Sequence, residues 1–382
     1  MRASEGHQIP TSKPRLEALD SLRGISALMV VLYHSSFPNF VHDLPVVRNS
    51  YLFVDFFFVL SGFIMYYNYK NIDGIVEFRR FIGLRFFRLY PLHLATLLAL
   101  LCWESLYTLA KLIYSQTSAA PSSNDAVALL LNLTLTNGIG IRPPSFNVPS
   151  WSISTEFWTY IIFGLIVTLS KRRLRIPVVY IFIFVSLASL VMLLRYVHPL
   201  NLGAMNFLLL PRCTFGFFLG ATLCAVFPNT GRINQERRNA AFGDAIQLLL
   251  IVGAVLMISY GGKSAWDFSM PLIFAAIIAS IVAWPRTRLT TIAESKIPMW
   301  LGRHSYSIYM VHWLAFIATS TFARTALHAQ QTNAGFVMSS AIGFSFLAVT
   351  IALILAAASM TYRYIEEPGR QLGRRILSKS TH

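Results

Sequence analysis

Charged side chains are scarce in this sequence, and acidic ones are the scarcest. Only 13% of the 382 residues are charged, 16 of them acidic and 32 basic, while 55% are hydrophobic. A soluble globular domain carries about 25% charged residues. The composition therefore excludes an ordinary soluble domain. It predicts an all-α, polytopic membrane helix bundle that forms a single integral-membrane domain over residues 1–382.

Cysteines are also few, and their number is odd. Cys102, Cys213 and Cys224 all lie in apolar runs, so neither a disulfide framework nor a zinc site is expected, and we interpret them as packing residues. The apolar run that follows the polar N-terminal stretch is longer than the core of a signal peptide and carries no small-residue cleavage site before a soluble body. We expect that run to remain in the protein as an uncleaved anchor.

Long apolar runs are what the sequence does contain. At about 20 residues per span, we predict about ten membrane-spanning helices. They form a transmembrane core over residues 17–359, and a cytoplasmic tail follows at 360–382. A shorter apolar segment at 124–135 is predicted to be interfacial or re-entrant. The spans are predicted at residues 17–37, 51–69, 85–110, 151–170, 176–195, 205–227, 244–260, 269–284, 300–322 and 335–359.

The basic residues are distributed unequally between the two faces that these spans create. One face holds 23 lysines and arginines and the other holds six, while three lie within or at the ends of spans. Loops rich in lysine and arginine stay in the cytoplasm. The prediction is that both termini are cytoplasmic, and that the net charge of +16 is a topology signal rather than a nucleic-acid patch.

Two ionisable residues lie in the first predicted span. Arg23 and His34 are eleven residues apart, so they share one helix face and differ in depth by roughly 16 Å. With a cytoplasmic N-terminus, Arg23 lies near the inner rim and His34 near the outer end. Ionisable groups within a membrane are costly and mark functional sites. The alternatives are an Arg23 that reaches the interface beside Asp20 and a neutral, packing His34.

Two acidic residues are predicted at the depth of His34. Asp55 begins the second span and Glu156 lies about one turn into the fourth, and both spans enter from the outer face. A carboxylate beside His34 would orient the imidazole and stabilise its protonated form, as in a general-base pair. Because both acids lie in first helical turns, each could instead stabilise a helix N-terminus.

Arginines cluster at the predicted cytoplasmic rim. The stretch RRFIGLRFFRLYP contains Arg79, Arg80, Arg85 and Arg88, of which the last two are three residues apart and face the same way. Guanidinium groups bind phosphates through paired N–H groups. The alternative is that these arginines set the topology and contact lipid headgroups.

The ninth predicted span begins with more polar side chains than an interfacial belt requires. The stretch LGRHSYSIYMVHW contains Arg303, His304, Ser305, Tyr306 and His312. Together, the ionisable groups are predicted to form a cationic layer inside and a histidine with carboxylates outside. This arrangement is expected of a protein that takes a phosphorylated donor from the cytoplasm and delivers a group to the other face.

Several separated motifs carry a resemblance to a known family. They occur in order along nearly the whole chain: LDSLRGISALMVVLYH, VDFFFVLSGFIM, RFFRLYP, VPSWSISTEFW, LGRHSYSIYMVHW and YIEEPGR. The chain thereby resembles membrane acyltransferase family 3, whose members transfer acyl groups, commonly acetyl, to hydroxyls of surface polysaccharides and other acceptors. Ile153 departs from the family pattern, which has leucine there. Within that family, the short cytoplasmic segments at both ends of the chain are most similar to those of the exopolysaccharide-production acyltransferases.

The resemblance implies roles for residues that line the first, second and fourth spans. It implies His34 as the catalytic histidine, Arg23 as its functional partner and Glu156 as a required carboxylate. Asp55 occupies the family's aspartate position, with a role that is either chemical or structural.

The resemblance also implies how the donor is held. Arg85 and Arg88 become candidates for contacting acyl-CoA, and we add Arg303 and Tyr306 from the ninth span as donor-binding candidates. Acetyl-CoA is the expected donor substrate, and no metal is expected.

The implied activity is transfer of an acyl group, most commonly acetyl, from cytoplasmic acyl-CoA to a sugar hydroxyl of a cell-surface polysaccharide or glycolipid, in a bacterial inner membrane. His34 would deprotonate the hydroxyl as general base or form an acetyl-histidine intermediate. The rival from another class is a transporter or flippase for a glycolipid or polysaccharide precursor. A third hypothesis is a regulatory subunit of a polysaccharide-synthesis complex. Acceptor, acyl group and oligomeric state stay open.

Overall fold

Helices make up almost all of the structure. The computed structural model describes residues 17–113, 124–171, 176–199, 201–204, 207–227, 239–332 and 335–378. Ten long helices in these ranges correspond to the ten predicted spans: α1 (Glu17–Tyr33), α3 (Phe53–Tyr69), α4 (Gly74–Ile113), α6 (Trp151–Leu169), α7 (Val178–Tyr196), α8 (Leu209–Val226), α9 (Ala240–Gly261), α10 (Met270–Ala283), α12 (Lys296–Ala326) and α13 (Ser340–Thr361).

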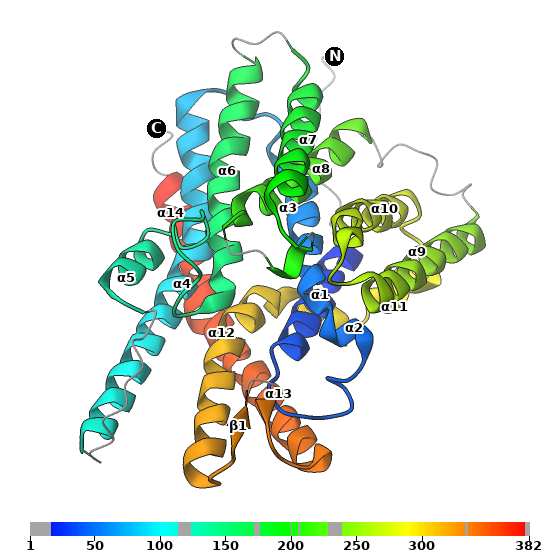
Figure 1. Cartoon of the computed structure of the whole chain (residues 1–382). Coiled ribbons are helices and arrows are strands. Elements are labelled where there is room, and N and C mark those ends of the chain that lie inside the picture. Colours follow the sequence, from blue (N-terminus) through cyan, green and yellow to red (C-terminus); the bar gives the residue numbers. More distant parts are fainter. Residues whose placement is uncertain are drawn as a thin grey trace, which may run out of the picture.

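Short elements connect the long helices. They are α2 (Pro45–Arg48), η1 (Ser50–Leu52), α5 (Ala126–Leu133), η2 (Val148–Ser150), η4 (Leu202–Ala204), η6 (Ala265–Ser269), α11 (Arg288–Ala293), η7 (Tyr362–Glu366) and α14 (Glu367–Ser378). A two-residue antiparallel pair, β1 (Gln331–Thr332) and β2 (Gly335–Phe336), joins α12 to α13. In Figure 1, α5 lies on one flank beside α4, and α9, α10 and α11 form the opposite flank.

Eight helices in the described part of the chain are long and apolar enough to cross a membrane. The predicted all-α, polytopic membrane bundle is therefore confirmed, while the cytoplasmic placement of the termini stays a prediction. The two remaining long helices are α1, which has 17 residues, and α12, which carries arginine and histidine side chains along its length. α1 carries Arg23, and α12 carries Arg303, His304 and His312.

Two stretches predicted to lie outside the spans are helical. α4 begins at Gly74, so residues 74–84, with Arg79 and Arg80, belong to the helix and not to a loop before the span predicted at 85–110. At the other end of the chain, the π-helix η7 leads from α13 into α14, which packs back along α4. The predicted tail is thus an ordered helix beside the arginines of α4.

The short apolar segment at 124–135 forms α5, an eight-residue helix too short to cross a membrane. Asp125 caps it, because its side chain accepts a hydrogen bond of 2.8 Å from the Ala128 N–H. That bond, together with an ion pair to Arg142, lowers the pKa of Asp125. The cap fixes where the long loop turns back towards α6.

Helices α1 and α12 pack closely side by side and run in the same direction. An added Cβ at Gly24 would lie 2.3 Å from the Gly302 nitrogen, and one at Gly302 would lie 2.2 Å from the Asp20 carbonyl oxygen. Only glycine permits such a close approach of two helix backbones. The contact sets the register of the two helices, so that Arg23 lies near Ser305 at one level and His34 near His312 at another.

Candidate active site

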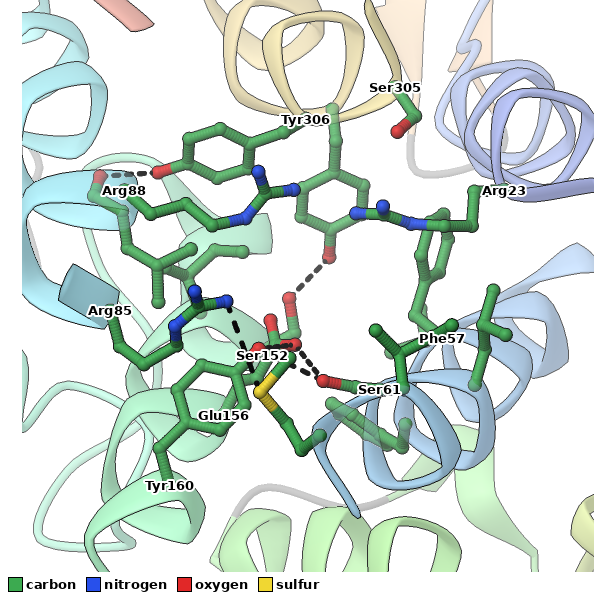
Figure 2. A pocket seen from close by; sticks show the side chains of 18 of the residues that line it. Arg23, Phe57, Ser61, Arg85, Arg88, Ser152, Glu156, Tyr160, Ser305 and Tyr306 are labelled. Carbon is green, nitrogen blue, oxygen red and sulfur yellow. Dashed lines mark hydrogen bonds between the residues drawn. The ribbon is translucent and has the colours of Figure 1, made fainter. Parts of the chain in front are cut away.

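Five helices enclose a cavity of about 200 Å³. Its lining brings together side chains from α1, α3, α4, α6 and α12, as Figure 2 shows. Five of the eight predicted site residues line it: Arg23, Arg85, Arg88, Glu156 and Tyr306. These positions are separated by up to 283 residues in the sequence, and the bundle gathers them around one space.

Three guanidinium groups approach this cavity from α1 and α4 (Figure 2). Arg85 donates a hydrogen bond of 2.8 Å to the Tyr69 hydroxyl, and its guanidinium carbon lies 5.1 Å from the centre of that ring. Arg23 lies 3.7 Å from the Asp20 carboxylate. Among the described residues, Arg88 has neither a hydrogen bond nor an ion pair. The arginines therefore retain N–H donors for an anionic ligand.

Glu156 lines the same cavity as the arginines (Figure 2). Its Oε1 accepts a hydrogen bond of 2.6 Å from the Ser61 hydroxyl and another from the Tyr160 hydroxyl. The sequence placed Glu156 beside His34, where it would orient the imidazole. The structure instead places the carboxylate in the arginine-lined cavity, because the rotation of α6 turns it towards α3 and α4.

His34 follows the last residue of α1 and is half-buried. Its Nδ1 lies 2.9 Å from the Val30 carbonyl oxygen and 3.3 Å from Nε2 of His312. The Tyr33 and Trp313 rings pack against its imidazole edge to face, at centroid distances of 5.0 Å and 5.5 Å. The partner of His34 is therefore a second histidine rather than a carboxylate. The sequence showed His312 on the polar ninth span but gave no sign of this contact.

Phe57 and Tyr309 form one wall of the cavity, called the shared wall below because Tyr309 also contacts His312. Both line the cavity, and Phe57 also packs against an apolar cluster formed by α1, α12 and α13. The Tyr309 hydroxyl donates to the Pro149 carbonyl oxygen at 2.9 Å and accepts a hydrogen bond of 2.9 Å from Ser152. The Tyr309 carbonyl oxygen lies 2.5 Å from Nδ1 of His312. One residue thus contacts both parts of the site.

Asp55 is not part of this site. Its carboxylate is fully buried and forms a two-pronged ion pair with Arg212 of α8, with distances of 2.7 Å and 3.0 Å. Arg212 also donates hydrogen bonds to the carbonyl oxygens of Leu202 and Tyr51. The prediction that Asp55 could orient His34 is corrected: both oxygens of the carboxylate are occupied by the guanidinium, and the pair ties α3 to α8.

Replacing Asp55 by alanine is expected to destabilise the fold by about 3–5 kcal/mol, because it leaves the Arg212 charge buried without its partner. Thermal unfolding of the purified protein in lipid nanodiscs measures this loss. The control is Asp43→Ala, which removes an exposed ion pair with Arg48 and should cost about 1 kcal/mol or less. Equal unfolding temperatures for the two variants would contradict the structural assignment of Asp55.

Arg303 also lies outside the cavity. Its side chain is exposed, whereas Ser305 and Tyr306, two and three residues further along α12, line the cavity. The prediction that Arg303 binds the donor is corrected, because the helix turns this side chain away from the site. Tyr306 is buried, and its hydroxyl donates to the Leu89 carbonyl oxygen at 2.5 Å, next to Arg88.

Comparison of the sequence with known protein families shows which type of reaction this protein belongs to. The family model described as an acyltransferase domain matches residues 16–359. The chain belongs to acyltransferase family 3. The family membership makes this multi-pass membrane protein an acyltransferase, and the named relatives are in line with transfer to oxygen.

Two curated relatives illustrate the range of the family. The chain is similar to the acyltransferase MdmB of Streptomyces mycarofaciens, with 26% identity over 96% of this chain and 95% of that protein. It is similar to the O-acetyltransferase OatA of Staphylococcus aureus, with 23% identity over 94% of this chain. The chain spans only 58% of the length of OatA. No solved structure matches this protein.

The described residues contain no group of three or more histidine, cysteine, aspartate or glutamate side chains that could hold a metal ion. The side chains that the structure gathers are guanidiniums, hydroxyls, one carboxylate and a histidine pair. Such groups bind anions, accept and donate hydrogen bonds and move protons.

Proposed function

We propose that this protein transfers an acyl group, acetyl in the first instance, from cytoplasmic acyl-CoA to a sugar hydroxyl of a cell-surface polysaccharide or glycolipid. The observation that carries the proposal is the convergence of Arg23, Arg85 and Arg88 on one cavity. CoA carries several phosphate groups, and guanidinium forks bind phosphate through two parallel hydrogen bonds. Family membership supplies the acyl chemistry, and the arginines favour CoA as the carrier.

In this account the donor lies along the cavity from the arginines towards the shared wall. Arg88 binds phosphate, since its guanidinium forms no hydrogen bond and no ion pair among the described residues. Arg85 binds beside it, and the Tyr69 hydroxyl fixes the position of the Arg85 guanidinium. Glu156 accepts hydrogen bonds from polar groups of the pantetheine arm through the oxygen that Ser61 and Tyr160 leave free. The arm then passes Phe57 and Tyr309 to bridge the roughly 16 Å rise between Arg23 and His34.

His34 acts as the general base. A ring nitrogen takes the proton of the sugar hydroxyl while its oxygen attacks the thioester carbonyl carbon. The carbon–sulfur bond breaks, and the proton passes from His34 to the departing CoA sulfur, which leaves as the free thiol. The alternative is an acetyl-histidine relay, which predicts parallel-line kinetics and a trapped acetyl-enzyme.

The cellular setting of this reaction is the bacterial inner membrane. Both termini are cytoplasmic, as the excess of basic residues on one face indicates. Residues 1–382 act as a single catalytic domain with a transmembrane core at 17–359, and α14 of the tail lies against α4 beside the donor arginines.

The test uses the purified protein in lipid nanodiscs with acetyl-CoA, with and without an envelope polysaccharide extract. Acceptor-dependent release of free CoA is the expected result. The rival, a flippase for a glycolipid or polysaccharide precursor, predicts movement of that precursor in proteoliposomes without release of CoA. That outcome would mean that the arginines set the membrane topology and do not bind a donor.

A further inference from the structure

A second histidine touches His34 and has no part in the reaction outlined above. His312 lies on α12 and is 0% exposed. Its Nε2 is 3.3 Å from Nδ1 of His34. The Phe316 and Tyr309 rings surround it at centroid distances of 6.4 Å and 5.5 Å. A buried polar ring in contact with the base is a candidate for controlling that base.

The backbone fixes which nitrogen of His312 carries its proton. Nδ1 lies 2.5 Å from the Tyr309 carbonyl oxygen, which can only accept a hydrogen bond. Nδ1 is therefore the protonated nitrogen. A neutral imidazole has one N–H, so Nε2 carries a lone pair and faces His34 as an acceptor.

The same reasoning fixes the proton on His34. Its Nδ1 lies 2.9 Å from the Val30 carbonyl oxygen and 3.3 Å from the lone pair of His312 Nε2. Both neighbours are acceptors, so Nδ1 of His34 is an N–H that donates to the two of them. Nε2 of His34 is left without a proton, which is the state that a general base requires.

We infer that His312 is a positioning residue for the transfer: it accepts a hydrogen bond from Nδ1–H of His34 and holds Nε2 of His34 as the basic atom. The inference rests on the proposed function, in which His34 takes the proton of the acceptor hydroxyl. When Nε2 gains that proton, His34 becomes an imidazolium and its Nδ1–H becomes a stronger donor. His312 and the Val30 carbonyl oxygen then stabilise the positive charge. In other enzymes with a histidine base, a carboxylate has this role.

Packing alone does not require a histidine at this position. Tyr33 and Trp313 already hold the His34 ring from two sides. An apolar residue at 312 would fill similar space beside Phe316. What such a residue would lack is the acceptor atom at 3.3 Å from Nδ1.

The first test compares His312→Leu with His312→Gln in acceptor-dependent CoA release. Leucine removes the acceptor, while the glutamine side-chain oxygen can replace Nε2. We expect His312→Leu to lower kcat about a hundredfold with an unchanged KM for acetyl-CoA, because the loss concerns the base and not the donor site. His312→Gln should recover at least about tenfold of that loss. Wild-type activity in the leucine variant, or equal losses in both folded variants, would overturn the inference.

A second measurement does not depend on turnover, and it reads the wild-type protein directly. Nitrogen-15 NMR of histidine-labelled wild-type protein reports which ring nitrogens are protonated, with His34→Ala and His312→Leu used to assign the signals. The inference predicts the proton on Nδ1 of both rings. A proton on Nε2 of His312 would overturn it even if the enzyme is active. Absent CoA turnover with the predicted tautomers would count against the proposed function instead.

Discussion

Replacing His34 by alanine will lower the rate of acyl transfer by about a thousandfold, because it removes the group that takes the hydroxyl proton. In the proposed function the donor binds at the arginines that line the cavity rather than at His34, so the KM for acetyl-CoA should stay near its wild-type value. Steady-state release of free CoA in nanodiscs, measured at several donor concentrations, separates the two parameters.

The control for this prediction is His198→Ala, which alters an exposed histidine in a loop. It should leave both parameters unchanged. A His34→Ala enzyme with a normal kcat and a raised KM would show that His34 contributes to donor binding and not to proton transfer.

The double variant Arg85→Gln/Arg88→Gln will raise the KM for acetyl-CoA by about a hundredfold or more. Each charged hydrogen bond to a phosphate contributes about 1.5–3 kcal/mol, and glutamine keeps similar length while it removes the charge. The kcat at saturating donor should change much less, because these contacts are made in the bound state as well as in the transition state.

Arg303→Gln is the matched control for the arginine variants. It removes a positive charge near the beginning of α12, but the side chain is exposed and does not line the cavity. Its KM should equal the wild-type value. An equal rise in KM for Arg303→Gln would mean that the arginines act through the net charge of the membrane surface rather than by direct contact.

The long helices could be predicted from the sequence because lipid imposes a simple requirement. Every backbone group must be satisfied within its segment, so each crossing demands a long apolar run. Eight of the ten predicted spans meet that rule in the described part of the chain, while α1 and α12 do not. The beginning of α4 was predicted at 85 and lies at Gly74, because the polar and basic residues of 74–84 look like a loop by composition. In the structure this part of the helix continues the span, and α14 packs against α4.

Which residues belong to the site could be predicted more readily than which side chains they contact. Arg85 and Arg88 were identified because they are three residues apart in a cluster of arginines and match a family motif, and they do line the cavity. Asp55 and Arg212 are equally unusual, but they are 157 residues apart and nothing in the sequence pairs them. Arg303 was misplaced for the related reason that hydropathy does not give the rotation of a helix about its axis.

The partner of His34 depends on the register between α1 and α12, which the Gly24–Gly302 contact sets. Neither glycine marks this contact in a single sequence. His312 therefore looked like one polar residue among several on the ninth span, although it is the side chain that meets His34 at 3.3 Å.

The most direct test of acyl transfer by this protein follows the acyl group itself. Purified protein in nanodiscs is incubated with isotopically labelled acetyl-CoA and an envelope polysaccharide extract, and the saccharides are analysed by mass spectrometry for labelled O-acetyl esters. The account predicts labelled esters with the wild type and with Arg303→Gln, and none above background with His34→Ala. Labelled saccharide in equal amount from His34→Ala, or label that never leaves CoA with the folded wild type, would contradict it.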